Sequence, residues 1–392
     1  MSIEALDLLL SPEGWTYASS PPVEPGDPGR FHALFGRDSL ITALQVLPAR
    51  PDVARATLRS LAALQGSRDD PDTDEEPGKI LHEYRPQAPA FLAENRWPVR
   101  DGRLLYYGSA DSTPWFLVVL GALGDEALTA ELEPAWRAAA GWLERSLERG
   151  GGLVRFGPRV NPGGLAQQGW RDAMAPVEQH PEGGGIVRPD GSAPRAPQAD
   201  ADVQAAAFAA LRALGALTGE EGWARRAEAL AARIERDFGP GIMALEGDDL
   251  AVPGPGSQLG WLLWSGALSR AGRDVVAERL CEPDILTAFG LRTLSSTSPV
   301  FDPQGYHRGA IWPFDSWLGW SGLRAARRDD DAERVRSGVL AALDHLGRAP
   351  ELYAVTRAGE LETAPAANRV QAWTVGARWA LENDWGGRPD WL

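Results

Sequence analysis

The chain has 392 residues, 44% of them hydrophobic and 24% charged, a composition that can bury a large core and excludes a disordered chain. A formal net charge of −15 leaves no basic stripe for phosphates, so we exclude nucleic acid and anionic membranes as partners and expect a neutral or cationic ligand. The single cysteine, Cys281, excludes an internal disulfide, and no apolar run is long enough to span a membrane.

The chain begins with MSIEALDLLLSPEG, which lacks the basic start and the long apolar run of a signal peptide. We therefore expect a cytoplasmic protein in which residues 1–34 are a short lead-in. Beyond them, ten segments show apolar residues at helical spacing, without a convincing alternating strand between them, which predicts an all-α fold. These segments are residues 39–47, 53–64, 113–123, 132–147, 201–217, 223–238, 259–268, 311–323, 332–346 and 370–381.

The predicted helices are of two kinds that alternate along the chain. One kind is apolar on every side and therefore buried, and the other carries Arg and Glu on a single face and is therefore amphipathic. The buried kind comprises residues 39–47, 113–123, 201–217, 259–268, 311–323 and 370–381. Six buried helices alternating with amphipathic ones predict an inner and an outer ring, an (α/α)6 barrel, in one domain that spans residues 1–392.

Five long connections each precede one of the buried helices. They are residues 65–111, 149–200, 239–258, 282–308 and 347–368. Loops of this length are uncommon unless they are functional. Because each leads into an inner helix, we expect all five at one end of the barrel, which is then the candidate active-site end.

The first chemical motif is Arg37-Asp38, at the mouth of the first buried helix. A guanidinium beside a carboxylate suits the paired hydroxyls of a sugar, although a capping Asp with an ion-paired neighbour explains the same residues. A second motif, Gly78-Lys79, lacks the other glycines and the Ser/Thr of a phosphate loop, so we reject nucleotide binding.

Two acidic residues stand out in the long loops. Asp172 follows Trp170 and Arg171, a setting in which the pKa of a general acid can be raised. Glu351 lies among apolar residues in Pro350-Glu351-Leu352-Tyr353. An acidic residue in such a place is either exposed or functional.

Aromatic and hydrogen-bonding residues head the last two buried helices, in the segments Tyr306–Asp315 and Val370–Trp373. Sugar subsites are built from such residues, and the 16 tryptophans of the chain can serve either sugar stacking or core packing. The five scattered histidines and one cysteine show no zinc-ligand spacing, so we predict neither a metal nor a cofactor.

Taken in order, eight segments between Phe35 and Trp379 resemble the amylo-α-1,6-glucosidase domain of glycogen-debranching enzymes and its six-hairpin, glucoamylase-like relatives. They are GRDSLITALQ (36–45), DEEPGKILHE (74–83), YYGSADSTPWF (106–116), QGWRDA (168–173), GLRTLSS (290–296), YHRGAIWPFDSW (306–317), PELY (350–353) and QAW (371–373). The resemblance implies an inverting glycosidase that cleaves an α-glucoside, with Asp172 as acid and Glu351 as base. It therefore implies that Asp172 is protonated and Glu351 ionised near the working pH.

The same resemblance implies that Arg37 and Asp38 hold the terminal sugar. Further substrate contacts are implied for Glu76, Lys79, His82, Glu83, Asp111, Trp170, Arg171, His307, Trp312, Asp315, Gln371 and Trp373. Only about thirty residues precede Phe35, whereas debranching enzymes usually carry a domain there. A small glucosylated metabolite is therefore a candidate substrate.

Three alternatives stay open. A hydrolase of the same barrel type could cleave a mannosyl- or glucosyl-glycerate compound, because hydroxyl geometry and not the carboxylate pair selects the sugar. A sugar epimerase would need a pair of proton-transferring groups, usually histidines. A noncatalytic glycan-binding protein would have Asp172 or Glu351 away from the cleft. The sequence leaves the oligomeric state open.

Overall fold

The structure is a computed structural model that describes residues 3–21, 30–157, 163–174 and 185–392. It is rich in helix, at 45% of the chain, and no described helix is both long and apolar enough to cross a membrane. The described helices are the 3-10 helix η1 (Ile3–Leu9) and α1 (Gly36–Gln45), α2 (Pro51–Ala63), α3 (Ala90–Glu94), α4 (Ser112–Leu123), α5 (Glu126–Glu131), α6 (Glu133–Arg149), α7 (Ala201–Thr218), α8 (Glu221–Asp237), α9 (Gln258–Ser265), α10 (Arg270–Leu280), α11 (Pro313–Ala325), α12 (Asp329–Leu346) and α13 (Ala372–Glu382).

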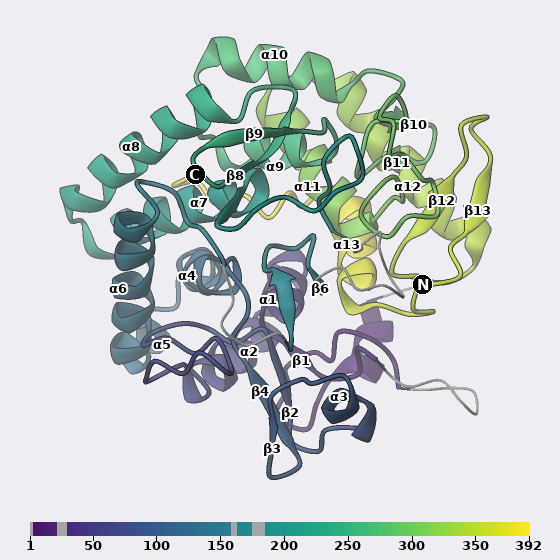
Figure 1. Ribbon diagram of the computed structural model, residues 1–392. Coiled ribbons are helices and arrows are strands. Elements are labelled where there is room, and N and C mark those ends of the chain that lie inside the picture. The colour runs from purple at the N-terminus through teal and green to yellow at the C-terminus, as the bar shows by residue number, and fades with distance from the viewer. Residues whose placement is uncertain (1–2, 22–29, 158–162, 175–184) are drawn as a thin grey trace.

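Six helices form a closed ring, in which α1, α4, α7, α9, α11 and α13 each contact the next and α13 returns to α1. These correspond to the six segments predicted to be buried, and every residue of α1 and α9 is buried. Around the ring, α2, α6, α8, α10, α12 and η1 contact its members from outside; Figure 1 shows α6, α8 and α10 along the periphery. The arrangement is consistent with an (α/α)6 barrel.

All ten predicted helices are present, within a few residues at each end. The sequence analysis did not predict α10, whose apolar side is limited to Val276, Ala277 and Leu280. It also missed the short helices η1, α3 and α5, which offer too few turns for a periodic pattern.

Two ring helices approach each other especially closely. A Cβ atom added to Gly260 of α9 would lie 2.5 Å from the Cα of Gly319 of α11. Only glycine permits this backbone contact, so the α9–α11 packing depends on these two residues.

The loops contain short strands, which the sequence analysis did not predict. They are β1 (Leu34–Phe35), β2 (Glu83–Arg85), β3 (Val99–Arg100), β4 (Arg103–Tyr106), β5 (Leu165–Gln167), β6 (Ala173–Met174), β7 (Gln198–Asp200), β8 (Ile242–Glu246), β9 (Leu250–Pro253), β10 (Leu286–Thr287), β11 (Gly290–Leu291), β12 (Tyr353–Val355) and β13 (Leu361–Thr363). None of them exceeds five residues, too short for an alternating pattern to stand out.

Antiparallel pairing of these strands orders the loops. One sheet has the order β1-β2-β4-β3, another β7-β8-β9, and the remaining strands form pairs. In the first sheet Glu83 is in register with both Phe35 and Tyr106. The chain before α1 is thereby held beside the loop before α4, and the predicted Arg37 and His82 motifs come together.

Candidate active site

A cavity of about 280 Å³ lies where these loops meet the ring, and we call it the carboxylate cavity. It takes residues from the start of α1 and from the loops before α4, α7, α11 and α13. Of the predicted site residues, it is lined by Arg37, Asp38, His82, Glu83, Trp170, Asp172, His307, Trp312, Glu351, Gln371 and Trp373. Both predicted catalytic carboxyl groups therefore face one cavity.

Arg37 holds Asp172 in place from the first turn of α1. Its guanidinium donates hydrogen bonds of 3.0 and 3.2 Å to the two carboxylate oxygens of Asp111 and another to Oδ2 of Asp172. Asp111 is fully buried and does not line the cavity, so it supports Arg37 instead of meeting a ligand directly. Asp172 is more exposed than Arg37 and Asp111, with 23% of its side chain accessible to solvent.

Glu351 is held by a different set of donors and is only 2% exposed. The hydroxyl of Tyr306 donates to Oε1, while the backbone N–H and the side-chain amide of Asn368 donate to Oε2 at 3.1 and 3.0 Å. Neither Tyr306 nor Asn368 was among the predicted site residues. Tyr306 stands beside His307 in an aromatic motif, whereas nothing in the local sequence marks Asn368.

The pKa values of the two carboxyl groups fall in the order opposite to our expectation. Burial raises the pKa of Asp172 to about 6 against the lowering effect of the adjacent Arg37 guanidinium. Burial raises the pKa of Glu351 to about 8, although the hydrogen bonds from Tyr306 and Asn368 favour its ionised form. The difference arises because Arg37 contacts Asp172 and not Glu351.

Other polar groups of the cavity are also buried. Burial raises the pKa of Asp38 to about 7, although Arg37 beside it acts in the opposite direction. Burial also lowers the pKa values of His82 and His307 well below the usual range, so both imidazoles are neutral near pH 7. They can exchange hydrogen bonds with sugar hydroxyls without adding charge.

Tryptophans form the deep wall of the cavity. Trp312 stacks on His307 with ring centroids 5.3 Å apart, and it meets Trp170 edge to face at 5.6 Å. Trp373 stacks on Phe314 at 3.8 Å. Its indole N–H is buried without a hydrogen-bond partner among the described residues, and it can donate to a ligand hydroxyl.

Arg171 and Asp315 lie beneath the cavity and do not line it. Arg171 is fully buried, bonds Asp202 at 3.2 Å, and places its guanidinium 4.4 Å from the centroid of the Trp170 ring. Asp315 accepts a 2.6 Å hydrogen bond from the indole of Trp261. The structure therefore places both predicted substrate contacts outside the cavity lining. The guanidinium of Arg171 is satisfied internally by Asp202, Thr293 and Ser257, whereas Asp315 bonds Trp261 through Oδ1 and keeps Oδ2 without a partner among the described residues.

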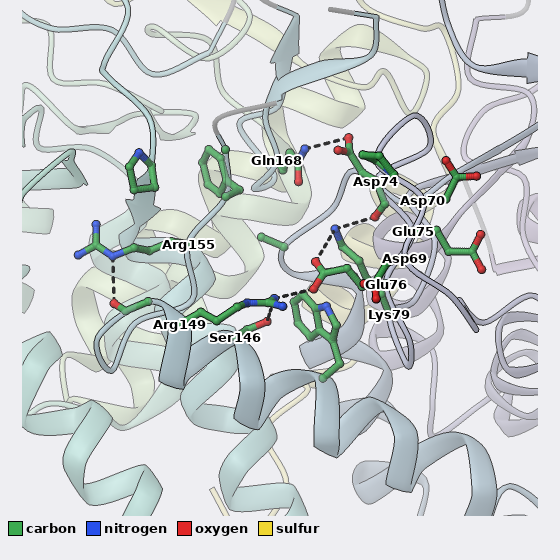
Figure 2. A pocket seen from close by; sticks show the side chains of 17 residues that line it. Asp69, Asp70, Asp74, Glu75, Glu76, Lys79, Ser146, Arg149, Arg155 and Gln168 are labelled. Atoms are coloured by element: carbon green, nitrogen blue, oxygen red, sulfur yellow. Dashed lines mark hydrogen bonds and ion pairs between the residues drawn. The ribbon is translucent and has the colours of Figure 1, made fainter. Parts of the chain in front are cut away.

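Glu76 and Lys79 line a separate cavity of about 520 Å³, which we call the Lys79 cavity. Figure 2 shows Glu76 between Lys79 and Arg149. Its Oε1 lies 3.6 Å from Nζ of Lys79, and its Oε2 lies 2.5 Å from Nη2 of Arg149. The two cavities share no lining residue. The intervening Ile80 and Leu81 are fully buried, so the chain passes through the core between the two cavities and the prediction for Glu76 and Lys79 is corrected.

No group of His, Cys, Asp and Glu side chains in the described ranges is arranged to hold a metal ion. The chemistry available to the carboxylate cavity is thus that of a half-buried and a buried carboxyl group, held on different supports, beside aromatic rings and hydrogen-bonding groups. Enzymes that hydrolyse glycosidic bonds typically use such a pair of carboxyl groups.

The chain is a glycoside hydrolase of the six-hairpin type. Residues 114–353, more than half of the chain, match the family described as the mannosylglycerate hydrolase MGH1-like glycoside hydrolase domain, and the chain belongs to that family. No curated protein matches the sequence. The family match does not confirm the more specific resemblance to glycogen-debranching enzymes.

Solved structures share the fold at low identity. The GH63 mannosylglycerate hydrolase from Thermus thermophilus in complex with Tris and D-glycerate has a TM-score of 0.67 at 18% identity, covering 97% of this chain and 98% of that one. Its complex with glucose has a TM-score of 0.66 at 19% identity and the same coverage. Neutral trehalase Nth1 from Saccharomyces cerevisiae has a TM-score of 0.61 at 17% identity, covering 91% of this chain and 72% of that one.

Proposed function

We propose that this protein hydrolyses the glycosidic bond of a small α-glycoside with inversion, and that Asp172 is the general acid and Glu351 the general base. The observation that carries the proposal is the meeting of the half-buried Asp172 and the buried Glu351, on separate supports, in one aromatic-walled cavity. We further propose that the helix ring with its outer helices is a single (α/α)6 domain, in which the loops of one end build this site.

The reaction needs one proton on the carboxyl pair. Protonated Asp172 gives its proton to the glycosidic oxygen as the bond from that oxygen to the anomeric carbon breaks. Ionised Glu351 takes a proton from a water molecule whose oxygen forms the new bond to the anomeric carbon from the opposite side. The products are a free sugar of inverted configuration and the released alcohol, and one proton remains on the pair.

The proposed binding groups surround the sugar. Arg37 and Asp38 are assigned to its hydroxyls, with His82, His307, Gln371 and the N–H of Trp373 as further partners. A volume of about 280 Å³ lies just below the usual range for ligand pockets, which begins at about 300 Å³. This size favours one sugar with a small substituent over a branch of glycogen.

A second candidate substrate is a mannosyl- or glucosyl-glycerate compound. It is supported by the family match, and by the glycerate and glucose bound in the Thermus thermophilus enzyme. The same carboxyl pair would serve either substrate, because the two candidates differ in the sugar or in the departing group and not in the bond that breaks.

The test is hydrolysis of a panel of α-glucosides, α-mannosides and their glycerate compounds, with proton NMR of the first product. We expect the β-anomer to appear first. Asp172→Asn and Glu351→Gln should each lower turnover by about 10² to 10⁴. Asp274→Asn, a matched change of an exposed acid on α10, should have no effect. Initial release of the α-anomer, or full activity in either active-site variant, contradicts the proposal.

A further inference from the structure

The proposed acid, Asp172, lies in the turn of a short hairpin. Strands β5 and β6 pair antiparallel with Gln167 opposite Ala173, so residues 168–172 form the turn between them. The turn contains neither helix nor strand. A general acid must stand within hydrogen-bond distance of the departing oxygen, and small displacements of a catalytic group are costly. Other parts of the molecule must therefore hold this turn in place.

Arg171, the residue before the acid, fastens the turn to the inner ring of helices. Its side chain is fully buried, and all three nitrogen atoms of its guanidinium donate hydrogen bonds. Nε donates to Oδ2 of Asp202 at 3.2 Å, Nη1 to the carbonyl oxygen of Thr293 at 3.0 Å, and Nη2 to Oγ of Ser257 at 2.8 Å. The acceptors lie in the first turn of α7, in the segment before α11 and at the residue before α9. One side chain thus joins the turn to three members of the ring.

The two ends of the turn are anchored separately. The carbonyl oxygen of Gln168 accepts a 2.8 Å hydrogen bond from the backbone N–H of Ala110. At the other end, the carboxyl group of Asp172 accepts a hydrogen bond from Arg37 of α1. Arg171 lies between these two points and fixes how closely the turn approaches the ring. A shift of its guanidinium would therefore move the carboxyl group of the next residue.

We infer that Arg171 is a positioning residue for the proposed acid, setting the place of the Asp172 carboxyl group without touching the substrate. This inference rests on the proposed function, since it takes Asp172 as the acid. Arg171 does not line the carboxylate cavity. A guanidinium suits this role because its rigid planar fork meets several acceptors in fixed directions, which the flexible ammonium group of lysine does not.

A second contact of Arg171 defines the alternative explanation. Its guanidinium carbon lies 4.4 Å from the centroid of the Trp170 ring, in the deep wall of the cavity. A residue that acted only through that wall would affect the binding of the sugar, whatever group departs. A residue that positions the acid affects chiefly the reactions in which the departing atom needs a proton. The two roles therefore differ in their dependence on the leaving group.

The experiment compares two leaving groups in the wild-type protein and in Arg171→Lys. One substrate is the methyl or glycerate α-glycoside, in the gluco or manno form, that the wild-type protein hydrolyses fastest; it releases an alcohol, whose oxygen must gain a proton. The other is the α-glycosyl fluoride of the same sugar, because fluoride is a stable anion that needs much less assistance. We expect Arg171→Lys to lower kcat about tenfold to a hundredfold on the glycoside and less than about threefold on the fluoride, with KM little changed.

Two further variants separate positioning from stability. Ser257→Ala removes one of the three hydrogen bonds and keeps the buried guanidinium, so it tests the inference if Arg171→Lys does not fold. We expect the same selective loss on the glycoside, at about threefold to tenfold. Arg292→Lys is the matched control, because Arg292 is also buried but donates to the carbonyl oxygens of Val355 and Thr356. It should leave the ratio of the two rates unchanged.

The possible failures are distinguishable. Equal losses on the glycoside and the fluoride would assign Arg171 to the sugar-binding wall and overturn the inference. Unchanged rates in Arg171→Lys, or in Ser257→Ala where the lysine variant does not fold, would overturn it as well. If the wild-type protein hydrolyses neither the methyl nor the glycerate compound in either sugar form, the proposed function fails instead.

Discussion

The hydrogen bond from Tyr306 to Glu351 offers a direct test of how the site controls its proposed base. Glu351 accepts three hydrogen bonds, and only the one from Tyr306 can be removed without altering the Asn368 loop. A hydrogen bond to a charged group typically contributes about 1.5 to 3 kcal/mol, and about 1.4 kcal/mol corresponds to one pKa unit. Tyr306→Phe should therefore raise the pKa of Glu351 by about one to two units.

The sign of the effect on rate follows from the proton count. The active pair carries one proton, so kcat/KM should rise through the pKa of Asp172, about 6, and fall through that of Glu351, about 8. Within this window the proton mostly resides on Glu351, and only the minor form has Asp172 protonated and Glu351 ionised. Raising the pKa of Glu351 makes that form rarer still, so Tyr306→Phe should lower kcat/KM about tenfold to a hundredfold.

The assay is a profile of kcat/KM between pH 4 and 10 for the wild-type protein and the variant. We expect the alkaline limb to move upward by about one to two units, while the acidic limb stays near pH 6. Tyr353→Phe is the matched control, because its hydroxyl donates to the backbone carbonyl of Phe289 at 2.6 Å and not to Glu351. An unchanged profile in Tyr306→Phe, or a shift of the acidic limb alone, refutes the reasoning.

Three more predictions concern binding, packing and the Lys79 cavity. Asp38→Ala should lower kcat/KM about tenfold to a hundredfold, because a charge-assisted hydrogen bond to the sugar is lost, while the midpoint of thermal unfolding stays unchanged. Unchanged activity would show that Asp38 is only a structural residue of α1. Gly260→Ala should lower the free energy of unfolding by about 1 to 3 kcal/mol in a urea titration, because the added Cβ would lie 2.5 Å from the Cα of Gly319. An unchanged free energy of unfolding would mean that α9 and α11 can move apart to make room. Glu76→Gln should leave KM unchanged but lower the midpoint of thermal unfolding, because the buried ammonium group of Lys79 would lose its charged partner. A raised KM would show that Glu76 contacts the substrate after all.

The helices were predictable because the information that specifies them is local. Apolar residues all round α4 or α11 predict burial, and a single polar face on α8 predicts an outer position, from the spacing of neighbouring residues alone. The motif residues at the starts of the inner helices were predictable for a related reason. Once those helices form one ring, the residues that precede them meet at one end.

The separation of the two cavities was not predictable, because it depends on where the chain crosses the core. Lys79 and His82 are three residues apart in sequence, yet they line different cavities since Ile80 and Leu81 are buried between them. Sequence proximity to His82 and Glu83 therefore made Glu76 and Lys79 look like partners of the same site.

The sequence by itself determined the helix-rich fold, its alternation of inner and outer helices, and the two candidate carboxyl groups, because each rests on local periodicity or a short motif. Only the tertiary structure decided which residues shift the pKa values of those two groups. Arg37 donates a hydrogen bond to Asp172, and Tyr306 and Asn368 donate hydrogen bonds to Glu351. It also brought Phe91 and Trp97 to the lining of the carboxylate cavity. Hydrogen bonds and burial join residues far apart in the chain, and pKa values depend on these distances, so their order follows from the folded arrangement and not from the motifs.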